Sequence, residues 1–131
     1  MADHRITIAV VDDDPFVLNV VQVLLQRSYV VLTATDGEDA LDLLHQHGGD
    51  IDLFLCDIVM PGFDGFEVAK RIIAQGLGIR VMLMSGFSTE HISQTIPGVP
   101  FLAKPFTRDV LETAVAEALS AKPPSHANSG M

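Results

Sequence analysis

Residues 6–14 have the sequence ITIAVVDDD, in which a largely apolar run ends abruptly at three consecutive aspartates. An apolar run rich in β-branched residues, without polar alternation, is typical of a strand buried on both faces of a parallel sheet. Three later apolar runs also end at residues that can do chemistry, namely Asp57, Ser85 and Lys104. Parallel strands have their carboxyl ends at one edge, where ligands bind in open α/β folds, so we expect these side chains to meet there.

Helix signals fill the intervals between the apolar runs. Asp14 followed by Pro15 predicts an N-cap and the first position of a helix. Asp64 with Glu67 has the spacing of a capping box, and Thr107 predicts the cap of a last helix. On the first helix, the spacing predicts a core-facing stripe made of Val17, Val20, Val21 and Leu24.

The predicted elements alternate along nearly the whole chain. Strands are predicted at 6–11, 29–34, 51–56, 79–84 and 99–103, and helices at 16–27, 38–47, 65–75, 88–95 and after Thr107. Five β/α units predict an α/β fold, a doubly wound parallel sheet with helices on both faces. We expect one domain over residues 1–121 and a flexible polar tail at 122–131, where Pro, Ser, Asn and Gly dominate.

Composition narrows the possible partners. The 131 residues carry a net charge of −9, which argues against nucleic acid or an anionic membrane surface as a direct partner. Neither a membrane-spanning window nor a signal peptide is evident, so a cytoplasmic location without membrane insertion is expected. The single cysteine, Cys56, lies inside an apolar run and is expected to be a core residue.

The acidic cluster predicts a cation site. Neighbouring carboxylates repel by roughly 1 kcal/mol in water and by several times that in a cleft, so Asp12 and Asp13 are costly without a cation. Hard oxygen ligands select Mg²⁺, or Mn²⁺ as a close substitute. Asp14 is assigned to helix capping instead, because Pro15 follows it directly.

Asp57 is the best candidate nucleophile. It ends a buried strand and precedes a Pro-Gly loop, so a rigid scaffold holds it and leaves one side open. Carboxylates form aspartyl-phosphates when a phosphoryl group is delivered in line. The charge that develops needs a metal ion and an ammonium group, which Lys104 can supply. Ser85 can donate a hydrogen bond to a phosphoryl oxygen.

Four motifs in chain order resemble one protein family. They are Val10–Pro15 (VVDDDP), Asp57–Gly65 (DIVMPGFDG), Met84–Gly86 (MSG) and Lys104–Phe106 (KPF). Over about residues 5–120 the chain resembles the receiver domain of bacterial two-component response regulators. The resemblance implies a flavodoxin-like sheet of five parallel strands in the order 2-1-3-4-5. It also implies phosphoryl transfer from a histidine kinase or a histidine phosphotransfer protein.

The same resemblance implies individual roles at the sheet edge. Asp57 would be the phosphoacceptor, with Asp13 and Asp57 as direct Mg²⁺ ligands. Asp12 would act on the metal largely through water, and the backbone carbonyl of Val59 would be the third protein ligand. Lys104 would contact the phosphoryl group, and the Lys104–Pro105 bond is a candidate for the cis form.

Ser85 and Phe101 fall on the family's hydroxyl and aromatic switch positions. Phe101 replaces the commoner Tyr or His, so any switching must rest on ring packing. The segment Ser85–Lys104 is also short, which reduces the helix predicted at 88–95 and resembles receivers attached to hybrid histidine kinases. We therefore expect the signalling surface at Phe87–Val99 together with the last helix.

Three other functions compete with the phosphorylated receiver. An FMN binder of the same topology would need a Ser/Thr/Gly-rich phosphate loop where three aspartates stand. A Mg²⁺-dependent aspartyl phosphatase would usually need an acid two residues after its nucleophile, where this chain has Val59. A docking module that uses the fold without phosphorylation is the remaining alternative, and the full acid, hydroxyl and lysine set argues against it.

The output is expected to be protein binding. No helix-turn-helix or catalytic output domain follows the receiver segment, which predicts a stand-alone or excised receiver that binds a downstream protein. We expect no enzyme activity beyond weak self-phosphorylation and self-dephosphorylation. The latter should be slow, because Val59 and Phe87 are apolar and offer no group to position an attacking water.

Overall fold

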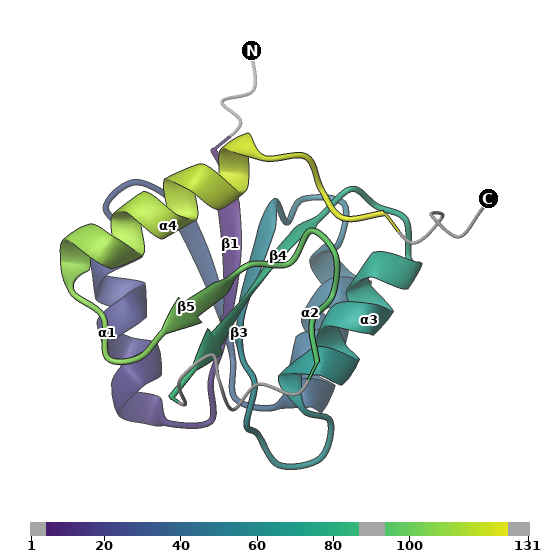
Figure 1. Cartoon of the computed structure of the whole chain (residues 1–131), viewed down its shortest axis with the longest axis horizontal. Coiled ribbons are helices and arrows are strands. Elements are labelled where there is room, and N and C mark those ends of the chain that lie inside the picture. Colours follow the sequence, from purple (N-terminus) through teal and green to yellow (C-terminus); the bar gives the residue numbers. More distant parts are fainter. Residues whose placement is uncertain (1–4, 87–93, 126–131) are drawn as a thin grey trace.

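A five-stranded parallel sheet, in the order β2-β1-β3-β4-β5, forms the centre of the structure (Figure 1). The structure is a computed structural model that describes residues 5–86 and 94–125. Its strands are β1 (Thr7–Val11), β2 (Val30–Ala34), β3 (Leu53–Asp57), β4 (Arg80–Ser85) and β5 (Phe101–Ala103). Its helices are α1 (Pro15–Leu25), α2 (Gly37–His47), α3 (Gly65–Ala74) and α4 (Arg108–Ser120).

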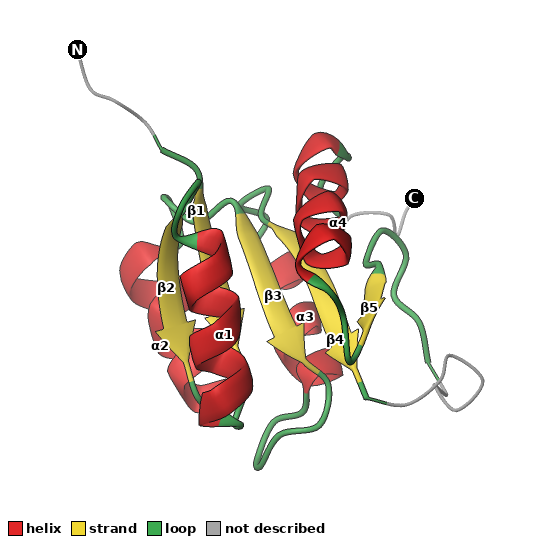
Figure 2. Ribbon diagram, turned by 90° about the vertical axis from the view of Figure 1, so that its left-hand side faces the viewer, coloured by secondary structure: helices red, strands yellow, loops and turns green. Residues whose placement is uncertain are grey.

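Two helices cover each face of the sheet (Figure 2). Helices α2 and α3 enclose one apolar core, and α1 and α4 enclose the other. Every residue of β1 and β3 is buried, which explains why these strands have nearly continuous apolar sequences. The predicted fold class and strand order are therefore confirmed.

The register of the strands creates the edge that was predicted to carry the chemistry. Val11 pairs with Cys56, and Ser85 pairs with Ala103. Each of the strands β1, β3, β4 and β5 thus ends close to its neighbour. The residues at or just beyond those ends are Asp12, Asp13, Asp57, Ser85 and Lys104.

Local capping follows the prediction. A carboxylate oxygen of Asp14 accepts the backbone N–H of Phe16 at 3.0 Å, at the start of α1. Asp64 accepts the N–H of Glu67 at 2.9 Å at the start of α3. The hydroxyl of Thr107 likewise accepts an N–H from the first turn of α4. These side chains satisfy backbone donors that have no partner within the helix.

The predicted inner stripe of α1 is confirmed for Val21, with Val17 and Leu24 partly buried against the same core, and is wrong for Val20. The buried residues are Leu18, Val21 and Leu25, whereas Val20 is exposed. Nine of the eleven α1 residues, PFVLNVVQVLL, are apolar or proline, so periodicity alone does not select one face. Contact with the sheet selects Leu18, which leaves part of the predicted stripe at the surface.

The start of the last strand also differs from the prediction. The last strand begins at Phe101, because Val99 donates its N–H to the carbonyl of Ile96 at 3.0 Å, in a turn with Gly98 at φ +82°. This turn ends just before the strand. The helix predicted at 88–95 lies largely outside the described residues.

Candidate functional site

Three carboxylates meet at the carboxyl edge of the sheet. Asp12 and Asp13 follow β1, and Asp57 is the last residue of β3. One carboxylate oxygen from each lies within 4.8 Å of the others. Asp12 is fully buried and Asp57 nearly so, whereas Asp13 is exposed. The cluster is therefore buried at Asp12 and Asp57 and open to solvent at Asp13.

Lys104, which directly follows β5, extends its ammonium group into this cluster. Its Nζ donates to Asp12 Oδ2 at 2.7 Å and lies 3.4 Å from Asp57 Oδ2. The other oxygen of Asp12 accepts the backbone N–H of Asp14 at 2.9 Å. Asp12 thus has a partner on each oxygen, while Asp57 faces the same ammonium at longer range.

The electrostatics of the cluster show a shortage of positive charge. Burial raises the pKa of Asp57, and repulsion from Asp12 and Asp13 raises it further, against the opposing effect of Lys104. Burial by itself would lower the pKa of Lys104. The hydrogen bond to Asp12 and the attraction of both carboxylates outweigh that effect, so its pKa is raised. One ammonium group thus faces three carboxylates.

This donor set fits a small divalent cation. Oxygens that bind one Mg²⁺ lie about 2.0–2.1 Å from it, so trans ligands are about 4 Å apart. The 4.8 Å spread of the three carboxylate oxygens approaches this range. After burial, repulsion from Asp12 and Asp13 contributes to the raised pKa of Asp57, and a cation at the cluster would offset that repulsion. The acidic cluster can therefore hold a metal ion.

Ser85 and Lys104 are held together by the backbone. Ser85 is the buried last residue of β4, and its carbonyl accepts the N–H of Lys104 at 2.7 Å. The Lys104–Pro105 peptide bond is cis, as expected. The β4–β5 register thus places the hydroxyl residue directly beside the lysine.

The connection between β3 and α3 closes tightly around Asp57. Ile58 donates its N–H to the carbonyl of Met84 at 3.0 Å, and Gly65 donates to the carbonyl of Ile58 at 2.8 Å. A Cβ added at Gly65 would collide with the carbonyl oxygen of Asp57. Between these anchor points, Val59 is 58% exposed.

Phe101 packs against the core that α2 and α3 cover. It is half-buried on β5, and its ring meets that of Phe66 edge-on, with 6.2 Å between the centroids. Its described aromatic partner therefore belongs to α3, and its predicted switching role stays a prediction.

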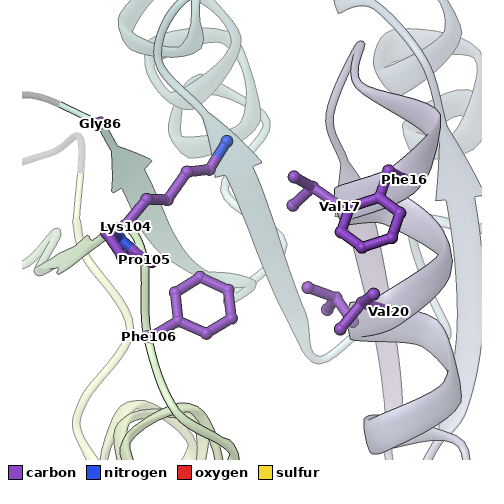
Figure 3. Close-up of a pocket in the computed structure, with 8 residues that line it drawn as sticks. Phe16, Val17, Val20, Gly86, Lys104, Pro105 and Phe106 are labelled. Atoms are coloured by element: carbon purple, nitrogen blue, oxygen red, sulfur yellow. The ribbon is translucent and has the colours of Figure 1, made fainter.

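An apolar groove, which the sequence interpretation missed, opens beside the lysine (Figure 3). It has a volume of about 420 Å³ and lies between α1 and the connection that follows β5. Its lining residues are Phe16, Val17, Val20, Val21, Gly86, Lys104, Pro105 and Phe106. A signal was present in the sequence, since α1 contains no ionisable residue and carries Phe16, Val20 and Val23 at i, i+4 and i+7. Phe16 is 74% exposed.

Comparison with known proteins identifies the family. The model of the response regulator receiver domain matches residues 8–116, which is most of the chain. The protein therefore belongs to the response regulator receiver domain family, as its motifs indicate. Within the described residues, no helix is both long and apolar enough to cross a membrane.

Individual relatives include both kinases and regulators. The sensor kinase CckA of Brucella abortus (strain 2308) is 31% identical over 111 residues, which are 82% of this chain and 12% of that protein. The response regulator GtcR of Aneurinibacillus migulanus is 34% identical over 106 residues, which are 76% of this chain and 42% of GtcR. The chain thus spans less than half the length of either relative.

Solved structures of receiver domains are similar to this chain in sequence and in fold. The receiver domain from the hybrid histidine kinase CckA is 38% identical with a TM-score of 0.73, and the match covers 87% of this chain and 99% of that one. A response regulator receiver protein from Sinorhizobium medicae WSM419 is 29% identical with a TM-score of 0.79, covering 89% and 96%.

Proposed function

We propose that this protein accepts a phosphoryl group on Asp57, in a Mg²⁺-dependent reaction, and signals by binding a downstream protein in its phosphorylated form. The donor is a histidine kinase or a histidine phosphotransfer protein. The observation that carries this proposal is the cluster of three carboxylates, which lie together with one lysine at the edge of the sheet. Membership of the receiver family supports it.

Each residue has a proposed part in the transfer. A carboxylate oxygen of Asp57 attacks the phosphorus, and the bond from phosphorus to the donor nitrogen breaks. Lys104 exchanges part of its contact with Asp57 for a phosphoryl oxygen, and the Ser85 hydroxyl donates to another. Asp13, Asp57 and the carbonyl of Val59 would hold Mg²⁺, with Asp12 acting through water. When bound, Mg²⁺ supplies positive charge to the phosphoryl oxygens.

Phosphate incorporation tests this proposal. Wild-type protein should take up phosphate from a small acyl phosphate with Mg²⁺ and none with a chelator, whereas Asp57→Asn should take up none. Asp64→Asn is the matched control, because Asp64 is an exposed helix cap outside the cluster. Incorporation into Asp57→Asn equal to wild type would overturn the assignment, and no incorporation by wild type from any donor would favour a docking module.

A metal titration tests the assignment of the acid pair. Asp13→Asn should weaken Mg²⁺ binding more than Asp14→Asn, because a carboxylate of Asp14 is already engaged with the N–H of Phe16. The reverse order would move the pair one residue along the chain.

The groove beside Lys104 is suited to a protein donor. A helix lying on Phe16, Val20 and Phe106 would bury apolar surface and could present a phosphohistidine to Asp57. Val20→Glu should therefore slow transfer from a phosphohistidine protein, while transfer from a small acyl phosphate stays normal. Val110→Glu is the matched control, since Val110 is an exposed valine on α4. Equal loss with both donors would mean that Val20→Glu damages the site itself.

The phosphorylated state should be long-lived for this family. Val59 is exposed near Asp57 and has no group that could orient a water molecule. Val59→Asn should accelerate loss of phosphate from purified phosphorylated protein. A wild-type lifetime of seconds that is unchanged in Val59→Asn would contradict this expectation.

A further inference from the structure

The connection between β3 and α3, residues 58–64, is braced through Phe63 by contacts with α2 and α3. Phe63 is half-buried there and contacts the first residue of α2, Gly37. A Cβ added at Gly37 would lie 2.6 Å from Phe63 Cβ and 2.9 Å from the Phe63 carbonyl oxygen. Since φ of Gly37 is not positive, this glycine is needed for close approach and not for an unusual backbone conformation.

The start of α2 is a firm support for this contact. Asp36 accepts the N–H of Asp39 at 2.8 Å, and the Thr35 hydroxyl donates to the Asp39 carboxylate at 3.0 Å. Gly37 itself is buried. The first turn of α2 is therefore fixed by its own hydrogen bonds, and an added side chain would displace Phe63 more readily than the helix.

A second contact holds the ring of Phe63. The guanidinium carbon of Arg71, on α3, lies 4.2 Å from the ring centroid. The Nε of Arg71 also donates a hydrogen bond of 3.0 Å to the carboxylate of Glu67, which holds the arginine in place. A cation placed over an aromatic face is attracted by the ring quadrupole. Phe63 thus has partners on two different helices.

We propose that Gly37 and Phe63 are positioning residues for the metal site, with Arg71 in support. They hold residues 58–64 so that the carbonyl of Val59 can face the carboxylates of Asp13 and Asp57. This inference rests on the proposed metal site and adds α2 to the elements that build it. Displacing Phe63 would move the Val59 carbonyl while leaving all three carboxylates in place.

Binding of Mn²⁺ alone, as a substitute for Mg²⁺, tests the inference without phosphorylation. Gly37→Ala should weaken Mn²⁺ affinity by about tenfold, as changes behind metal ligands commonly do. The bound ion should also gain a water molecule where the carbonyl was lost, seen as added line broadening of its EPR signal in oxygen-17 water. Gly49→Ala is the matched control, because a Cβ there meets nothing within 4 Å. Unchanged affinity, or weaker binding without the added water, would overturn the inference.

A second pair of variants decides the matter if Gly37→Ala does not fold. Arg71→Gln should weaken Mn²⁺ binding by up to about fivefold. Arg108→Gln should not, although Arg108 forms the same i,i+4 pair, 3.0 Å from Glu112. Equal affinities in these two variants would overturn the inference. Failure of wild-type protein to bind Mn²⁺ would instead overturn the proposed metal site, together with the inference.

Discussion

Asp12 is the most constrained residue of the site. Its carboxylate is inaccessible to solvent, and its two oxygens are bound by Lys104 Nζ and the N–H of Asp14. A buried charge of this kind is tolerated only while its partners are in place. The residue that holds the lysine in position is therefore distinct from the proposed phosphoacceptor, Asp57.

Removing the lysine should destabilise the protein strongly. Lys104→Met leaves Asp12 buried without a cation. We therefore expect the free energy of unfolding to fall by about 3 kcal/mol. Urea denaturation at neutral pH with a chelator measures this. Arg108→Met, which breaks an exposed pair, should cost less than about 1 kcal/mol. Similar losses in the two variants would mean that the Lys104–Asp12 contact contributes little.

The pH dependence of the Lys104 contribution follows from the direction of its pKa shift. Its pKa is raised in the folded protein, so the stabilisation is fully present below the ordinary lysine value. It is lost as the pH rises through the raised value. On the alkaline side of neutrality, the stability gap between wild type and Lys104→Met should accordingly stay constant until the solution is strongly alkaline and then narrow.

Whereas charged Lys104 stabilises the folded protein, ionised Asp57 destabilises it when no metal is bound. Its pKa is raised, so the folded state binds more protons than the unfolded state between the ordinary and the raised value. Stability therefore falls as the pH rises through that interval. With a chelator, Asp57→Asn should be more stable than wild type at neutral pH, and its advantage should shrink as the pH is lowered toward 4. A variant less stable than wild type at neutral pH would contradict this.

Sequence was sufficient to find the residues of the cluster but not their contacts. Asp12, Asp13, Asp57 and Lys104 could be predicted because each stands where an apolar run ends, and parallel strands bring those ends together. The contacts depend on side-chain reach, which places Lys104 2.7 Å from Asp12 and 3.4 Å from Asp57. No spacing in the sequence encodes that difference.

At the scale of elements, caps were predictable, whereas the inner face of α1 was predictable only in part, because Val20 is exposed. Asp14 and Asp64 act on backbone groups two or three residues away, so local sequence determines them. The orientation of α1 depends on contact with a distant part of the chain. Because almost every position of α1 is apolar, the sequence permits several phases.

A side chain at Gly65, where β3 is joined to α3, should destabilise the protein. An alanine Cβ at Gly65 would meet the carbonyl oxygen of Asp57 and lie 2.8 Å from Ile58 Cα, and both are backbone atoms. We expect Gly65→Ala to lower the free energy of unfolding by about 1–3 kcal/mol. Gly49→Ala should change it by less than about 0.5 kcal/mol. Denaturant unfolding of both variants with a chelator is the measurement, and equal stabilities would show that the junction relaxes easily.

At the scale of the whole molecule, β5 links the site to the surface of α4. The strand has three residues, pairs only with β4 within the described part of the chain, and leads directly to Lys104. The backbone N–H of Lys104 donates to the carbonyl of Ser85. Movement of either residue toward a phosphoryl group would therefore shift this hydrogen bond, and β5 with it. A short edge strand has few other contacts to resist that movement.

Amide exchange should detect this response. With a small acyl phosphate and Mg²⁺, protection should change in β5 and α4 as well as around Asp57. Asp57→Asn under the same conditions is the control and should show no change. Changes confined to the surroundings of Asp57 would mean that another face carries the signal. The segment expected from sequence, Phe87–Val99, lies mostly outside the described residues.

Cys56 gives the protein a built-in reporter of its own opening. Its thiol is fully buried in β3 and lies 3.5 Å from the carbonyl oxygen of Asp57. Burial raises its pKa and shields it from solvent, so a thiol reagent can react only after the core between the sheet and helices α2 and α3 opens. The chain has no tryptophan and one tyrosine, which leaves little intrinsic fluorescence. The rate of labelling of this thiol therefore measures how often this core opens, and a metal ion or phosphoryl group at Asp57 should slow the labelling.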